Sequence, residues 1–248
     1  MSWICLPKLQ KQTRQKLSRQ ELEFLVREAP ERRHAVLYAL LAASGLRRSE
    51  ALGLEIKHLS NDCSTITVKQ QRVRGGAVKA TLKTDAATRT VDVHPSIAAM
   101  LRVYVDGRRI GYLFHATKVG WRNRAKGIVN PIYVTIDPHN VVRDSLDELM
   151  LKLGRGQEAG EGFHMLRRFR KSQLIRAEID SLIRNFWFGH ADKSMDRVYA
   201  EELLSDTVHL KAQVVKAGLG FDIPASLLVA PSCSPGLQNK EVVALVAA

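Results

Sequence analysis

The sequence has few cysteines and no paired cysteine motif. Cys5, Cys63 and Cys233 are the three cysteines among 248 residues, and they lie far apart. An odd number at such spacing is typical neither of a zinc site nor of a disulfide-rich domain. We therefore expect inert thiols, no zinc site of paired cysteines, and a reducing, cytoplasmic location.

Long apolar runs are also missing, and acidic residues are scarce. No stretch has the roughly 20 apolar residues that span a bilayer, and no export signal is recognisable. Asp and Glu number 25 against 38 Lys and Arg, which gives a net charge of +13. Such an excess favours a polyanionic partner, because each neutralised phosphate releases counterions. The weaker alternatives are an anionic membrane surface and a basic protein whose charge only aids solubility.

Helical patterns dominate what is present. In "LSRQELEFLVREA", Ser18 and Glu21 have the spacing of a capping box, and Leu17 and Leu22 can form a hydrophobic staple. A second apolar helix in "HAVLYALLAA" ends at Gly45, just before "LRRSEALGL". Further helices are predicted over residues 96–108, 137–154 (with Gly154 near its end), 164–178, 180–187 and 194–217.

Three short segments rich in β-branched residues interrupt the helices. They are "STITVKQQRV", "AVKATL" and "TRTVDV", with Gly75 and Gly76 at the first turn. A polar, basic loop is predicted from His115 to Lys126. The pattern indicates a mainly helical α+β protein with a small three-stranded antiparallel sheet.

Polar residues stand at the breaks between these elements. Arg47 follows the turn at Gly45, with Glu50 three positions later, and His164 and Arg167 share one helical face. The candidate site residues, in chain order, are Arg47, Lys83, His164, Arg167, His190 and Tyr199, with Glu50 in support.

These residue types suit chemistry on a phosphodiester. Arginine forks bind non-bridging oxygens, and tyrosine can attack phosphorus. An ammonium group can protonate a departing oxygen, and imidazoles can move protons or donate hydrogen bonds. No carboxylate cluster suited to Mg²⁺ accompanies the candidates. Taken singly, each has an ordinary explanation: Tyr199 packs on a helix, His190 caps one, and Lys83 is a solvated lysine.

Together, the residues resemble the catalytic domain of the tyrosine recombinase (phage integrase) family. Ser44, Gly45, Arg47 and Glu50 match its S/T-G-x-R-x-x-E box, and Lys83 matches its β-hairpin lysine. The H-x-L-R-R/H box and the G-H pair with a tyrosine nine residues later are matched by His164, Leu166, Arg167, Arg168, Gly189, His190 and Tyr199. The resemblance covers residues 17 to about 217. Phe188 replaces the leucine common before the G-H pair.

The resemblance implies a role for each candidate. Arg47, Arg167 and His190 would bind the scissile phosphate, and Tyr199 would attack it to form a 3′-phosphotyrosyl bond. Lys83 would protonate the 5′ oxygen as general acid, and His164 would assist as general base. Glu50 would support the helix of Arg47. The implied function is site-specific DNA recombination by an integrase of a mobile genetic element, without ATP, metal or cofactor.

The resemblance also implies a domain organisation and partners. Residues 1–16 would be a basic segment, with the usual preceding core-binding domain absent or truncated. Residues 17–221 would be the catalytic domain. Residues 222–248 would be a tail, in which "EVVALVAA" is either a segment that docks on another subunit or a frayed end. The expected partners are double-stranded DNA and further subunits in a dimer or tetramer on DNA, with no membrane.

Two other functions stay open at this point. One is a type IB-like topoisomerase, a group that tends to have lysine where this chain has His164. The other is a non-catalytic DNA-binding remnant of a mobile element.

Overall fold

The computed structural model describes residues 16–73, 76–80, 87–118, 132–155, 162–190 and 197–230, with only the backbone described at 117–118, 132–133 and 197–200. The helices are α1 (Arg19–Arg27), α2 (Arg32–Ser44), α3 (Arg48–Gly53), η1 (Ile56–His58), α4 (Pro95–Val105), α6 (Pro138–Val141), η3 (Val142–Leu146), α7 (Asp147–Lys152), α8 (Phe163–Arg176), α9 (Ser181–Phe188), α10 (Arg197–Ser205), α11 (Thr207–Ala217) and α12 (Ala225–Leu228). The strands are β1 (Thr65–Val68), β2 (Gln71–Arg72), β3 (Val78–Lys79), β4 (Arg89–Asp92), β5 (His115–Lys118) and β6 (Ile132–Thr135). The predicted mainly helical α+β class is confirmed.

Helix α1 begins as its sequence predicts. The Glu21 N–H donates to Ser18 Oγ at 3.2 Å, and the Ser18 N–H donates to Glu21 Oε2 at 2.7 Å. This reciprocal pair satisfies two donors that a helix start otherwise leaves unpaired. Leu17 and Leu22 are both buried, as expected for a staple.

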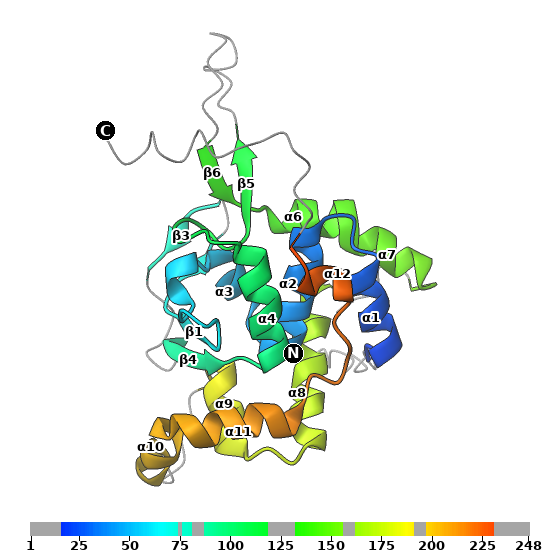
Figure 1. The fold of residues 1–248 in the computed structure, drawn as a ribbon. Coiled ribbons are helices and arrows are strands. Elements are labelled where there is room, and N and C mark those ends of the chain that lie inside the picture. Colours follow the sequence, from blue (N-terminus) through cyan, green and yellow to red (C-terminus); the bar gives the residue numbers. More distant parts are fainter. Residues whose placement is uncertain are drawn as a thin grey trace, which may run out of the picture.

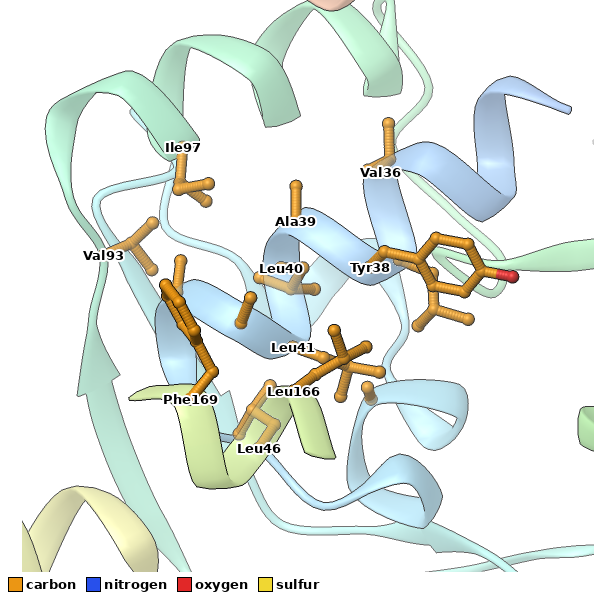
Figure 2. Close-up of a cluster of buried hydrophobic side chains, with 14 of the residues drawn as sticks. Val36, Tyr38, Ala39, Leu40, Leu41, Leu46, Val93, Ile97, Leu166 and Phe169 are labelled. Carbon is orange, nitrogen blue, oxygen red and sulfur yellow. The ribbon is translucent and has the colours of Figure 1, made fainter. Parts of the chain in front are cut away.

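Helix α2 forms the centre of the core. Every residue from His34 to Ser44 is buried, because α1, α4 and α8 all pack against this helix (Figure 1). Leu166 and Phe169 of α8 and Ile97 of α4 lie around its apolar side chains (Figure 2). A helix that is apolar all round in this way needs neighbours on every side, and its position fixes theirs.

Helix α2 ends at a glycine that no other residue could replace without strain. Gly45 has φ +69°, and a Cβ added there would lie 2.7 Å from the Phe188 ring. This tight turn leads directly into α3 with Arg47 as its N-terminal cap residue.

The sheet differs in detail from the predicted three-stranded one. Within the described residues, β1 pairs with β4 and β2 pairs with β3, both antiparallel, as two separate two-stranded ladders. The predicted first strand breaks because the buried Gln70 amide donates to the Gly53 carbonyl and to Glu55 Oε1. Its continuation β2 packs on α3 instead, where Gly53 lets the backbone of Gln71 and Arg72 approach closely.

The prediction of a loop at His115 was wrong for its first residues. Residues 115–118 form β5, which pairs antiparallel with β6. Four residues of mixed polarity carry little local strand signal, and the partner strand comes later in the chain. In Figure 1 this hairpin extends from the end of the molecule opposite α10 and α11.

Two predicted helices have internal irregularities. The helical stretch predicted over 137–154 contains the π-helix η3, where the Tyr38 hydroxyl donates to Ser145 Oγ at 2.7 Å inside the core. The stretch predicted over 194–217 is two helices, because Asp206 accepts from the N–H groups of Val208 and His209 and so starts α11.

The described part of the predicted tail packs on the same chain. Leu227 of α12 is buried against α4, and Arg32 Nη2 donates to the carbonyls of Leu227 and Val229. Residues 1–15 and the candidate docking segment 241–248 lie outside the described residues. None of the described helices is both long and apolar enough to cross a membrane.

Candidate active site

The turn after α2 holds Arg47 through Glu50. The Arg47 N–H donates to Glu50 Oε2 at 2.8 Å, and Arg47 Nη1 donates to Glu50 Oε1 at 2.7 Å. The side chain of Arg47 is 41% exposed, whereas that of Glu50 is 2% exposed. Glu50 therefore fixes Arg47 from the protein side, as the sequence indicated, and leaves the guanidinium open to solvent.

A second arginine, Arg89 of β4, also binds Glu50. Arg89 Nη2 donates to Glu50 Oε2 at 2.9 Å, and Arg89 Nη1 lies 3.4 Å from Glu50 Oε1. The Arg89 side chain has no solvent exposure. The strand prediction over 88–93 did not single out this residue, although the pattern contains a signal. Thr88 and Thr90 are exposed, and Arg89 lies between them on the inward face of the strand with Val91. A buried arginine on such a face needs an acceptor.

Glu50 is thus a buried carboxylate shared by two guanidinium groups. Burial opposes its ionisation, but hydrogen bonds and charges from Arg89 and Arg47 outweigh burial and hold the pKa of Glu50 below its ordinary value. The carboxylate is ionised at neutral pH, so it can hold both arginines by charge-assisted hydrogen bonds.

Helix α8 brings Arg167 to the same turn. Arg167 Nη1 donates to the Gly45 carbonyl, and its Nη2 donates to the Phe188 carbonyl at 2.8 Å. Its guanidinium also stacks 4.4 Å from the centre of the Phe188 ring. Burial, followed by the neighbouring charge of Arg47, lowers the pKa of Arg167 to about 10. Two guanidinium groups held together in this way favour an anion between them.

His190 stands at the end of α9, beside Arg167. Its Nε2 lies 3.3 Å from Arg167 Nη2, and its backbone N–H donates to the Asn185 carbonyl. Gly189 makes this ending possible, since it has φ +60° and leaves no room for a Cβ beside the Arg89 guanidinium. Partial desolvation, and then the charges of Arg167, Lys171, Arg47 and Arg89, lower the pKa of His190. The imidazole is therefore neutral at pH 7.

The other candidates are placed less completely. His164 lies exposed in the first turn of α8, three residues before Arg167. Tyr199 lies in α10, which packs against α9 and α11, and the described structure includes its backbone alone. Lys83 lies outside the described residues. The structure therefore brings together Arg47, Glu50, Arg167 and His190, and adds Arg89.

The arrangement suits the binding of a phosphate. Around the turn at Gly45, three arginines face one carboxylate, which leaves an excess of positive charge. Across the described ranges, no three His, Cys, Asp or Glu residues gather as they would around a metal ion.

A sequence model of the phage integrase family matches residues 15–204, which is most of the chain. The chain belongs to the phage integrase family. Membership makes it a tyrosine site-specific recombinase, an enzyme class that breaks and rejoins DNA strands. No curated relative matches the chain.

Solved structures of integrases and recombinases share the fold. The Tn1549 transposon integrase, solved with transposon right end DNA, has a TM-score of 0.53 and 19% identity over 79% of this chain and 67% of its own. The integrase of mycobacterium phage Brujita has a TM-score of 0.55 and 20% identity over 91% of this chain and 66% of its own. The XerA recombinase has a TM-score of 0.51 and 21% identity over 85% of this chain and 66% of its own. This integrase-family chain thus spans about two thirds of the length of these solved chains.

Proposed function

We propose that this recombinase cleaves one strand of double-stranded DNA with Tyr199 and later rejoins it to another. The Tyr199 oxygen attacks the scissile phosphorus, and the bond from phosphorus to the 5′ oxygen breaks. The products are a 3′-phosphotyrosyl ester and a free 5′ hydroxyl. The 5′ hydroxyl of a second strand then attacks this ester and releases Tyr199. Each step exchanges one phosphoester for another, so the sequence of steps needs no ATP.

The observation that carries this proposal is the meeting of Arg47, Arg167 and His190 at one turn. Arg47 points its partly exposed guanidinium outward, and Arg167 and His190 lie beside it from α8 and the end of α9. Their donors would bind the two non-bridging oxygens and stabilise the extra negative charge of a pentavalent phosphorus. A neutral His190 donates a hydrogen bond without needing to lose or gain a proton.

Two residues would move the protons. Lys83 would protonate the leaving 5′ oxygen, and His164 would take the proton from the Tyr199 hydroxyl as general base. The support for Lys83 is its sequence match alone. His164 has the position for such a role, because it is exposed at the first turn of α8, one turn ahead of Arg167.

The charge distribution supports DNA as the partner. Where α8 meets the residues before α1, four basic side chains line a hollow together with Leu17, Phe169, Ser172 and Ile175; the basic residues are Lys16, Arg168, Lys171 and Arg176. Such a cluster is suited to the phosphates of a DNA backbone. We further propose that several copies assemble on DNA, as an exchange between two duplexes requires, that residues 17–221 form the catalytic unit, and that the protein acts in the cytoplasm.

Covalent capture tests this function and finds the DNA site in the same experiment. Nicked duplexes are tiled across the genomic neighbourhood of the gene and incubated with the protein. After denaturation with detergent, protein–DNA adducts are isolated and their DNA is sequenced. We expect one short sequence to be enriched by the wild-type protein and no adduct from Tyr199→Phe, which should still bind that sequence. An adduct formed by Tyr199→Phe contradicts the assignment.

The same preparation separates recombination from the two alternatives. Sequence-independent relaxation of a supercoiled plasmid would indicate a type IB-like topoisomerase. DNA binding with no adduct on any duplex would indicate a non-catalytic remnant. Strand exchange between two duplexes that carry the captured sequence is the result we expect.

A further inference from the structure

Three arginines lie around the turn at Gly45, namely Arg47, Arg89 and Arg167. Arg89 cannot contact DNA, because its side chain has no solvent exposure. We propose that Arg89 is a positioning residue of the active site: through Glu50 it holds Arg47 in place and leaves the charge of Arg47 available to the scissile phosphate. This inference rests on the proposed function.

The contacts of Arg89 reach three separate parts of the chain. Its Nε donates to the Trp187 carbonyl at 2.8 Å, its Nη1 donates to the Ala87 carbonyl at 2.9 Å, and its Nη2 donates to Glu50. The end of α9, the start of β4 and helix α3 are therefore tied to one planar group. Only a guanidinium offers donors in enough directions to do this.

The charges explain why Glu50 needs a second arginine. Glu50 with Arg47 alone would form a neutral pair, and its carboxylate would compete with a phosphate for the Arg47 donors. With Arg89 added, the carboxylate is shared, and the three groups together have a net charge of +1. Because the Glu50 carboxylate is already paired with Arg89, it can hold Arg47 in place. It then weakens the attraction of Arg47 for an anion less than an unshared carboxylate would.

Arg89 also sets the position of His190. Gly189 packs so closely on Arg89 that an added Cβ would lie 2.8 Å from Nη1. The hydrogen bond to the Trp187 carbonyl fixes the last turn of α9 just before this contact. Arg89 thus supports both sides of the phosphate site, Arg47 through Glu50 and His190 through the backbone.

Arg89 also binds the backbone that follows the proposed general acid in the sequence. Ala87, whose carbonyl Arg89 binds, follows Lys83 by four positions in the sequence. This bond holds the residues just before β4.

Single-turnover cleavage of the captured nicked duplex tests the proposal with three variants. Arg89→Gln removes the charge and most of the fork, Arg89→Lys keeps the charge without the fork, and Arg155→Gln is the matched control. Arg155 forms an ion pair with Glu21 at 3.0 Å, and its side chain is 6% exposed, but the pair links α1 with a residue three positions after α7 rather than with the site.

The expected results separate positioning from general stability. Arg89→Gln should slow cleavage on the order of 100-fold, as small displacements of catalytic groups do. Its equilibrium affinity for the duplex should stay within about threefold of wild type, since Arg89 touches no DNA. Arg89→Lys should cleave about tenfold faster than Arg89→Gln, because a positive charge beside Glu50 is restored but the other hydrogen bonds are not. Arg155→Gln should lose stability but cleave at the wild-type rate.

A second readout uses the free protein, so it does not depend on the DNA reaction. The His190 pKa is followed by NMR in wild type, Arg89→Gln and Arg89→Lys. The charged groups that face this imidazole are Arg167 and Lys171 from α8, Arg47 from the start of α3 and Arg89 from β4. Loss of the Arg89 charge should raise the His190 pKa, and lysine should restore it.

Each outcome decides one question. If wild-type protein forms no adduct, the proposed function fails, and the His190 titration still tests Arg89. If Arg89→Gln cleaves at the wild-type rate, or is slowed no more than Arg155→Gln, the positioning role is wrong although the function stands. If Arg89→Gln does not fold, Arg89→Lys decides: a rate about tenfold below wild type with unchanged affinity supports the role, and a wild-type rate overturns it.

Discussion

Arg167 and Arg170 are one turn apart on α8, both are buried, and the pKa of each is lowered to about 10, yet their surroundings differ. Arg167 faces a second guanidinium, a shared carboxylate and His190. Arg170 faces the end of α11, where its Nη1 donates to the Gly218 carbonyl at 2.6 Å. Burial alone lowers the pKa of Arg170, whereas like charge adds to burial at Arg167.

The difference separates the proposed phosphate-binding arginine from a structural one. The carbonyl end of a helix carries a partial negative charge, so Arg170 already has its counter-charge and stabilises α11. Arg167 has like-charged neighbours, and an anion bound beside it would relieve their repulsion, as its proposed role in phosphate binding requires. The "LRRFR" segment alone does not distinguish these arginines; the elements that each one faces do.

Arg167→Gln should give the largest effect. Loss of a charged donor to the transition state should slow cleavage of the captured duplex by about 100- to 1,000-fold. Stability should change by about 1 kcal/mol or less, because the lost hydrogen bonds are offset by relief of repulsion from Arg47. Single-turnover rates and urea denaturation measure the two quantities.

Arg170→Ala should show the reverse pattern. Loss of the charged bond to the Gly218 carbonyl should destabilise the fold by about 1.5–3 kcal/mol. In the fraction of the variant that remains folded at the assay temperature, cleavage should stay close to the wild-type rate. If Arg170→Ala abolished cleavage while stability was unchanged, the comparison of the two arginines would be wrong.

Substitutions at two glycines test the same difference between the two regions while Arg167 and Arg170 stay unchanged. Gly189 and Gly220 have φ +60° and +77°, and an added Cβ would lie 2.8 Å from Arg89 Nη1 and 2.7 Å from the Gln173 side chain, respectively. Alanine at either position should cost about 1–2 kcal/mol in backbone strain. Only Gly189→Ala should also slow cleavage, because it displaces Arg89, whereas the flexible end of Gln173 can move. Equal cleavage rates in the two variants would contradict this distinction.

The smallest expected effect is a pH dependence of stability. It involves His94, which lies near Arg170, and His190, which lies near Arg167. Desolvation first, then Arg170 for His94 and Arg167 for His190, lowers the pKa of each histidine below its ordinary value of 6.5. The unfolded chain therefore binds more protons just below pH 6.5, and stability should fall as the pH drops through this value. Glu50, with a pKa below 4.5, contributes only at lower pH.

Urea midpoints between about pH 7.5 and 5 measure this dependence. His94→Asn and His190→Asn should each make the fall shallower, and the double variant should make it shallower still. A slope that neither substitution changes would assign the effect to the other histidines with lowered pKa, which are His34, His58 and His115.

Local signals in the sequence predicted the features that depend on neighbouring residues. The capping box at Ser18, the turn at Gly45 and the shared face of His164 and Arg167 each lie within a few residues of chain, so spacing alone reveals them. The resemblance to the family then predicted a shared phosphate site for Arg47, Arg167 and His190. The structure brings the three residues close together, and their roles stay a prediction.

The features that sequence reasoning missed depend on distant partners. Arg89 binds Glu50 across 39 positions and Trp187 across 98. Strand β5 exists because β6 pairs with it, and β2 leaves β1 because Gln70 bonds back to Gly53. Spacing in the chain does not encode such contacts. The alternation of polar and apolar residues in the predicted strand does put Arg89 on the inward face, and this could have identified it as a buried arginine.

Mass spectrometry of the covalent adduct identifies the residue that attacks the DNA. Wild-type protein trapped on the captured nicked duplex is digested with nuclease and protease, and the modified peptide is sequenced. We expect a nucleotide joined through its 3′ phosphate to the oxygen of Tyr199. A nucleotide on any other residue, or one joined through a 5′ phosphate, would contradict this expectation.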